Sequence, residues 1–133
     1  MKICWLFLAL LTTTLNLPAD DTKSSAPMKI STWEATNYFS KEMIVTGKVA
    51  QVSVRPSVVF LNMDKPYPDS PFTLVIFPAE TNQFGNIKAL RGASVEVTGL
   101  ITNYHDRAEI VLKDASQLKV TSPAPAKAHS TEH

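Results

Sequence analysis

Apolar and polar residues alternate along several short stretches of this chain, which is the pattern of β-strands with one buried face. The longest stretch lies between residues 43 and 54, where every second residue up to position 49 is apolar or glycine. The apolar positions then move by one residue, to Ala50, Val52 and Val54. Because side chains in a strand alternate faces, such a shift is typical of a β-bulge. We therefore predict one long strand, Met43–Val54, with an irregularity near its middle.

A short motif of this strand occurs twice. Val45-Thr46-Gly47 returns as Val97-Thr98-Gly99 within a second alternating stretch, Ser94–Tyr104. A glycine inside a strand has no side chain to pack, so it usually marks a bulge or a sharp bend. Two long strands that bend at matching points are what the closure of a small β-barrel requires.

The remaining predicted strands are shorter. They lie at Ser57–Met63, Phe72–Phe77 and Glu109–Lys113, and a brief closing segment follows at Gln117–Val120. His105–Ala108 is predicted to be a hairpin turn.

A short helix is predicted between the third and fourth strands. Phe84, Ile87 and Leu90 keep helical spacing within Pro78–Leu90, but Gly85 interrupts them. Glycine weakens a helix interior, so we expect this helix to be short or irregular.

A second short helix is predicted near the N-terminus, at Thr32–Phe39. Ser31 and Glu34 have the spacing of a capping box, which marks a helix start. We expect Trp33, at the beginning of this helix, to plug one end of the barrel.

The order of elements is strand, strand, strand, helix, strand, strand. That order indicates an all-β domain with the OB-fold, a five-stranded Greek-key barrel. We expect this domain to span residues 30–121, with a flexible leader at 20–29 and a disordered tail at 122–133.

The first nineteen residues have the layout of a secretory signal peptide. Met1-Lys2 is a short positive region, Ile3–Leu11 is apolar but too short to span a bilayer, and Thr12–Pro18 is polar and helix-breaking. Ala19 offers a small residue for cleavage. We predict an exported protein, periplasmic or secreted, with no membrane span after cleavage; an uncleaved N-terminal anchor is the alternative.

Charge and cysteine content narrow the chemistry further. The chain has 13 Lys and Arg against 12 Asp and Glu, and cleavage would remove Lys2, which leaves 12 against 12. There is then no global basic field to attract nucleic acid and no acidic field to attract cations. The single cysteine, Cys4, would also be lost, so a disulfide or a thiolate site is not expected.

Several motifs, taken together, resemble small bacterial OB-fold proteins of the nucleic-acid-binding superfamily, which include exported single-domain members. The motifs are Val45-Thr46-Gly47-Lys48-Val49, Phe60-Leu61-Asn62, Leu90-Arg91-Gly92, Val97-Thr98-Gly99 and Ile110-Val111-Leu112. The resemblance covers about residues 30–120. It implies the OB-fold, and it implies function only weakly, because one fold carries many functions.

OB-folds typically bind ligands on the face of strands two and three, between the loops that follow strands one and four. On this chain that rule selects nine candidate ligand-binding residues. They are Phe60, Asn62, Tyr67, Phe72 and Phe77, flanked by Lys48, Arg55, Tyr104 and Arg107.

Each candidate also has a plainer interpretation. The three phenylalanines are favoured as core residues, because aromatic side chains dominate protein cores. The basic residues are equally well explained as solvated surface charges. Tyr67 and Tyr104 lie beside polar loops, and we expect them to be exposed.

The sequence gives little support for catalysis, so we predict a non-enzymatic protein without metal or cofactor. No carboxylate pair has enzyme-like spacing, and the Asp, Glu and Arg cluster of OB-fold thermonucleases is not visible. His105, His129 and His133 do not have the spacing of metal ligands.

Two kinds of partner remain open. Aromatic and basic residues together favour single-stranded nucleic acid, because bases stack on aromatic rings and phosphates bind cations. Neutral charge, export and apolar residues on both faces of Phe72–Phe77 favour an envelope protein, peptide or glycan instead. An enzyme stays a third hypothesis, which a buried titratable pair in a pocket would revive.

Overall fold

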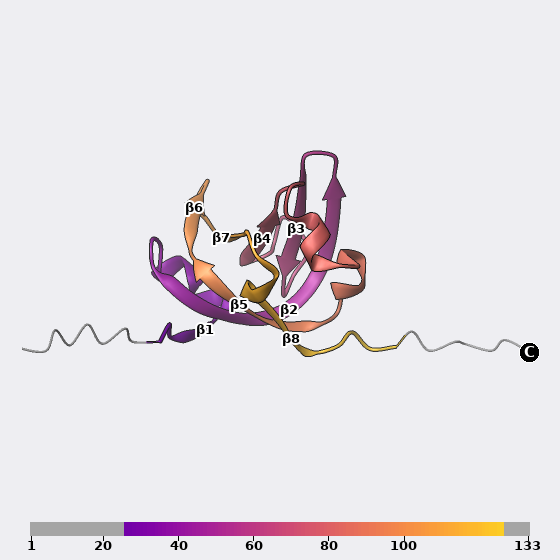
Figure 1. Cartoon of the computed structure of the whole chain (residues 1–133). Helices are drawn as coiled ribbons and strands as arrows, with labels where there is room; N and C mark the ends of the chain where they lie inside the picture. The colour runs from indigo at the N-terminus through magenta and orange to yellow at the C-terminus, as the bar shows by residue number, and fades with distance from the viewer. Residues whose placement is uncertain (1–25, 127–133) are drawn as a thin grey trace, which may run out of the picture.

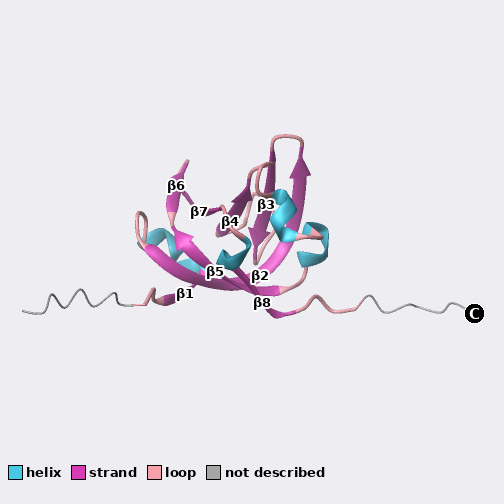
Figure 2. Cartoon of the chain, in the orientation of Figure 1, coloured by secondary structure: helices cyan, strands magenta, loops and turns pink. Residues whose placement is uncertain are grey.

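The computed structural model describes residues 26–126, and within that range it is mostly β-structure (Figures 1 and 2). Eight strands form one mixed sheet. They are β1 (Lys29–Ser31), β2 (Glu42–Arg55), β3 (Val58–Met63), β4 (Phe72–Ile76), β5 (Ser94–Leu100), β6 (Thr102–Tyr104), β7 (Arg107–Leu112) and β8 (Leu118–Ser122). No helix in this part of the chain is long and apolar enough to cross a membrane.

The long strand β2 is shared by two parts of the sheet. Its first half pairs with β5 and its second half with β3, both antiparallel. The register with β3 shifts between Val49 and Gln51, which confirms the irregularity predicted from the change of apolar phase. Figure 1 shows β2 as one curved ribbon that passes beneath the sheet and rises into the β2–β3 hairpin.

The sheet curls so that its strands enclose the core. The strand order is β6-β7-β4-β3-β2-β5-β8, with β1 also paired to β2, and β4 and β7 are parallel. Only Ile101 separates β5 from β6, so one continuous segment pairs with β2 at one side and with β7 at the other. The sheet is therefore bent back towards itself, as the curvature in Figure 1 shows.

The two repeated glycines allow close approach between layers. Pairing between β2 and β5 is regular at both of them, and the register shift lies beyond Gly47 instead. A Cβ on Gly47 would lie 2.6 Å from Thr32 Cγ2, and one on Gly99 would lie 2.7 Å from Ile110 Cγ2. Glycine is thus required here because neighbouring side chains occupy the space that a Cβ would take.

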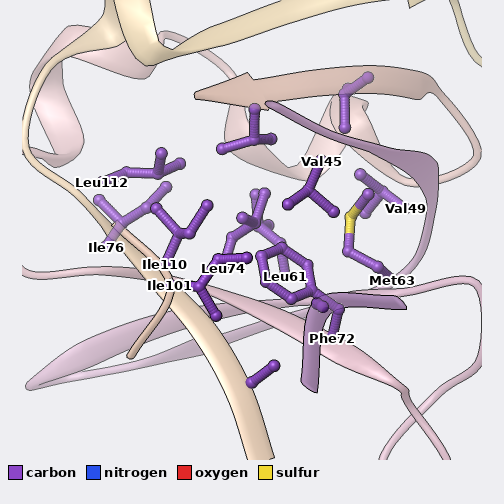
Figure 3. Packing of buried hydrophobic residues seen from close by; sticks show 14 of the residues in the cluster. Val45, Val49, Leu61, Met63, Phe72, Leu74, Ile76, Ile101, Ile110 and Leu112 are labelled. Atoms are coloured by element: carbon purple, nitrogen blue, oxygen red, sulfur yellow. The ribbon is translucent and has the colours of Figure 1, made fainter. Parts of the chain in front are cut away.

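The core is apolar and is drawn from every long strand. Figure 3 shows how its side chains converge between the strands. The largest fully buried ones are Phe72, Leu61, Met63, Leu74, Ile76, Ile101, Ile110 and Leu112. Val45 and Val49 of β2 also point into this cluster, so the first half of β2 turns its odd-numbered residues towards the core.

The helices are shorter than predicted and are all of the 3-10 type within the described range. The helix expected at Pro78–Leu90 is two separate turns, η2 (Thr81–Phe84) and η3 (Ile87–Leu90). Gly85 ends the first turn with φ 60°, a conformation that favours glycine. The expected irregularity is therefore confirmed, and its cause is the glycine.

The N-terminal helix is η1 (Thr32–Asn37), and its predicted capping box is present. Thr32 and Ala35 are fully buried, but Trp33 is 57% exposed and carries Lys65 Nζ 5.3 Å above its ring. The expectation that Trp33 plugs the barrel is therefore wrong. Thr32 takes the inward position instead, where its hydroxyl donates to Asp64 Oδ2.

The prediction of five strands is also wrong. Ser94–Tyr104 is two strands because the backbone of Ile101 bonds Ser40 N and Lys41 O and leaves the ladder. Two more strands are β1, which begins at Lys29 at the end of the predicted leader, and β8, which extends the predicted closing segment to Ser122. The predicted signal peptide, residues 20–25 of the leader and residues 127–133 of the tail lie outside the described residues.

Substitution of Gly99 by alanine tests the close approach of β5 and β7. The new Cβ meets Ile110 Cγ2 at 2.7 Å and Gln117 Nε2 at 3.1 Å, so we expect the free energy of unfolding to fall by about 1–3 kcal/mol in urea titrations. Leu100→Ala is the control in the same strand, because Leu100 is 52% exposed and its loss should cost only about 0.5 kcal/mol. Equal losses for the two variants would contradict this account.

Candidate functional site

A groove of about 790 Å³ lies on the outer face of the sheet. It runs from the second half of β2 across β3 and β4 to β7 and the β6–β7 turn. Its lining residues are Gln51, Ser53, Arg55, Phe60, Asn62, Tyr67, Thr73, Tyr104, His105, Arg107 and Glu109.

The floor of the groove is a row of polar residues that are partners in adjacent strands. Gln51 is in register with Asn62, Asn62 with Thr73, and Thr73 with Glu109. Asn62 donates to Gln51 Oε1 at 2.9 Å, and Thr73 Oγ1 donates to Asn62 Oδ1 at 3.0 Å. Because Asn62 is 4% exposed and bonded at both ends of its amide, the centre of the floor is held rigidly.

Tyr67 and Arg107 form one wall. The backbone N–H of Tyr67 donates to Gln51 Oε1 at 3.0 Å, which ties the β3–β4 loop to the floor. The guanidinium of Arg107 lies 4.8 Å from the centre of the Tyr67 ring, and its Nη2 donates to Pro68 O at 2.9 Å. Tyr67 is nevertheless 66% exposed, so most of its side chain remains accessible.

Tyr104 and His105 form a second aromatic group, at the β6–β7 turn. Their rings meet edge to face with centroids 4.4 Å apart. The turn has positive φ at His105 and Asp106, 50° and 61°, which confirms a hairpin turn here. It is shorter than predicted, because Arg107 and Ala108 already belong to β7. Asp106 N donates to Asn103 Oδ1 at 2.9 Å and fixes the turn, while Tyr104 stays 59% exposed.

Glu109 places a carboxylate at the end of the polar row. Burial raises the pKa of this carboxyl above its ordinary 4.5. Its partners in the neighbouring strands are Thr73 and Thr102, and Tyr104, His105 and Arg107 line the same groove. Within residues 26–126 the Glu109 carboxylate makes no hydrogen bond and no ion pair. The Thr102 hydroxyl donates to the backbone oxygen of Glu109, at 3.2 Å, and not to its carboxylate.

Six of the nine candidate residues come together in this groove: Arg55, Phe60, Asn62, Tyr67, Tyr104 and Arg107. Phe72 does not, because it is 1% exposed and shares the inward phase of Leu74 and Ile76. Phe77 follows β4 and is 46% exposed, and Lys48 is exposed on β2, but neither lines the groove.

The sequence did not single out Gln51, Ser53, Thr73, His105 and Glu109, which also line the groove. Four of them belong to strands, and their importance depends on which strand lies next to which. The outward phase of β2, β4 and β7 would have indicated their face, but only the register brings Gln51, Thr73 and Glu109 into one row with Asn62.

A second cavity, of about 510 Å³, lies between the β2–β3 hairpin and the η2–η3 segment. Arg55 lines both cavities, and Lys88, Asn82 and Asn86 contribute polar groups to the second. It contains no aromatic side chain, so it lacks the stacking surfaces of the first. Among the residues that the structure describes, no group of three or more His, Cys, Asp or Glu is placed to hold a metal ion.

Comparison with known proteins identifies the fold. No protein-family model matches the sequence, and a search of curated proteins gives no match. A putative aspartyl-tRNA synthetase from Leishmania major Friedlin is similar with a TM-score of 0.55 and 14% identity, over 79% of this chain and 22% of the synthetase. Entamoeba histolytica asparaginyl-tRNA synthetase is similar with a TM-score of 0.54 and 21% identity, over 76% of this chain and 25% of that enzyme.

A third similar structure, OBody AM1L10 bound to hen egg-white lysozyme, has a TM-score of 0.54 and 17% identity, over 71% of this chain and 92% of the OBody. The chain thus corresponds to a small part of each synthetase and to nearly all of the OBody. This protein has an OB-like fold. At these identities the likeness is evidence of fold alone.

Replacement of Gln51 by leucine tests the rigid floor. It removes the acceptor of Asn62 Nδ2 and of Tyr67 N, and leaves the buried Asn62 amide with an unsatisfied donor. We expect a loss of about 1–3 kcal/mol in the free energy of unfolding and faster amide hydrogen exchange at Tyr67. Ser53→Ala, in the same strand and groove, is the control and should change neither quantity.

The raised pKa of Glu109 predicts a pH dependence of stability. A carboxyl whose pKa is raised by folding favours the native state below its unfolded pKa, and that contribution is lost as the pH rises through the folded pKa. Glu109→Gln stays neutral throughout. We expect the melting temperature of this variant, relative to the parent, to be higher at pH 7 than at pH 4. A constant difference across that range would show that burial of the carboxylate has no cost.

Proposed function

We propose that this protein is a non-enzymatic binding module that holds single-stranded nucleic acid in the groove. The observation that carries the proposal is the gathering of two exposed tyrosines, Tyr67 and Tyr104, with two arginines, Arg55 and Arg107, around one face. OB-folds that bind single-stranded nucleic acid usually combine exposed aromatic side chains, on which bases stack, with nearby basic residues.

Each part of the groove has a role in this proposal. Bases stack on the exposed tyrosines, since every base has a π-face. Arg55, at the tip of the β2–β3 hairpin, and Arg107, at the β6–β7 turn, bind phosphates at the two ends of the groove. Arg107 is already oriented by Pro68 O and the Tyr67 ring, so little side-chain freedom is lost when a phosphate binds.

The charge of the groove predicts a moderate affinity. The groove is lined by two arginines and one carboxylate, that of Glu109, and the whole chain has a formal net charge of only +1. Long-range attraction of a polyanion is therefore weak, and binding depends on local contacts. The two similar synthetases are named for a tRNA, which agrees with this proposal. Their similarity to this chain is evidence of the fold alone.

The proposed place of action is outside the cytoplasm. It is supported by the signal-peptide layout of residues 1–19. Secretion assays with a reporter fused after residue 30 test it, and retention of the reporter in the cytoplasm would refute it.

A protein, peptide or glycan is the second candidate ligand. The near-neutral net charge of the chain favours such a ligand. OBody AM1L10, which this chain matches over 92% of the OBody's length, is bound to a protein, hen egg-white lysozyme. Binding of this kind would depend little on salt, whereas nucleic-acid binding weakens steeply as salt rises.

Fluorescence anisotropy with labelled single-stranded oligonucleotides at low salt tests the first candidate. We expect Tyr67→Ala and Tyr104→Ala each to weaken binding by about 1–3 kcal/mol, the value of one stacked base. We expect Arg55→Ala to reduce the slope of log K against log salt by about 0.7, the contribution of one phosphate on a single strand.

Matched controls come from candidate residues that lie outside the groove. Phe77→Ala removes an exposed aromatic ring and Lys48→Ala removes an exposed cation, and both variants should bind like the parent protein. No binding at high micromolar protein, or binding that salt does not change, would refute the nucleic-acid proposal.

A further inference from the structure

Glu109 is the residue that a simple phosphate-binding groove does not explain. Its carboxylate lies on the groove face, yet a polyanion would be repelled by it. Such a residue is compatible with nucleic acid only where it faces a base rather than the backbone.

The surroundings leave this carboxylate free to accept hydrogen bonds from a ligand. Arg107, two residues earlier on the same face of β7, is directed towards the β3–β4 loop, where it donates to Pro68 O and lies 4.8 Å from the centre of the Tyr67 ring. Thr73, the register partner of Glu109, donates its hydroxyl to Asn62. Neither neighbour satisfies the carboxylate, and within residues 26–126 no other group does.

The bases of DNA and RNA differ in the hydrogen-bond donors that they offer to an ionised carboxylate, which can only accept hydrogen bonds. Guanine presents N1–H and the N2 amino group side by side, so it can form two parallel bonds to the two oxygens. Cytosine and adenine offer one amino group next to an acceptor nitrogen. Thymine and uracil offer one N–H between two carbonyl oxygens, which repel the carboxylate.

We infer that the groove reads a guanine base, with Glu109 accepting from its Watson–Crick edge while the ring stacks on Tyr67 or Tyr104. This inference rests on the proposed function. It adds base selectivity to a surface that stacking alone would leave indifferent to sequence. It also accounts for burial of the carboxylate, because paired N–H donors replace the water that the ionised group loses.

The test compares single strands of about ten thymidines that differ only at one central position. That position holds dT, dG, dA, dC or deoxyinosine, which keeps N1–H but lacks the amino group. We expect the dG strand to bind about tenfold more tightly than the dT strand, and the inosine strand to lose most of that gain. Competition with free guanosine monophosphate distinguishes a base within a strand from a mononucleotide ligand, and weak competition is expected.

Glu109→Gln should reduce the preference for dG to less than twofold, because an amide presents only one acceptor. Glu42→Gln is the charge-matched control, since Glu42 is exposed on the first half of β2 and does not line the groove; it should keep the tenfold preference.

Equal binding of all five strands, or a dG preference that survives Glu109→Gln, would overturn the guanine inference while the proposed function stands. Failure of every strand to bind would overturn both. If guanosine monophosphate competes more strongly than the dG strand, the groove binds a free guanine nucleotide. That result would overturn recognition of guanine within a strand.

Discussion

β2 is one strand that serves two halves of the sheet, and the rest of the structure depends on this sharing. Its backbone bonds β5 before the bulge and β3 after it. The bulge changes which face of β2 points inwards, so Val49 packs into the core while Gln51 two residues later lies on the outer face. Without that change, the polar end of β2 would not reach the groove floor.

The groove combines a rigid floor with accessible walls. Gln51, Asn62 and Thr73 fix one another by hydrogen bonds, and Gln51 also holds the loop that carries Tyr67. Tyr67 of the β3–β4 loop and Tyr104 at the end of β6 remain largely exposed. A surface of this kind is organised before a ligand arrives, which lowers the entropy lost on binding.

The charge of the groove is mixed, and this distinguishes it from a purely electrostatic site. Arg55 and Arg107 lie at its ends, and Arg107 is held there by its hydrogen bond to Pro68 O. The Glu109 carboxylate lies at the end of the row of polar side chains that forms the floor. Cations at the ends suit a charged backbone, and an acceptor between them suits a base edge or a hydroxyl group. Selectivity among ligands would thus come from where these charged side chains lie in the groove rather than from the net charge of the protein.

The local pattern of the sequence determined the main strands β2, β3, β4 and β7, the irregularity in β2, the turn at His105 and Asp106, the capping box and the break at Gly85. These features follow from side-chain periodicity and from the backbone preferences of single residues, which act over a few positions. The interpretation of Phe72 as a core residue is confirmed, because Phe72 is 1% exposed.

The tertiary structure alone decided how those elements meet. Ile101 leaves the ladder because Ser40 and Lys41, far away in sequence, bond its backbone. Trp33 is exposed because Thr32 takes the inward place beside Asp64. The row of Gln51, Asn62, Thr73 and Glu109 exists only through the register of four strands, and register depends on long-range pairing that no short stretch of sequence contains.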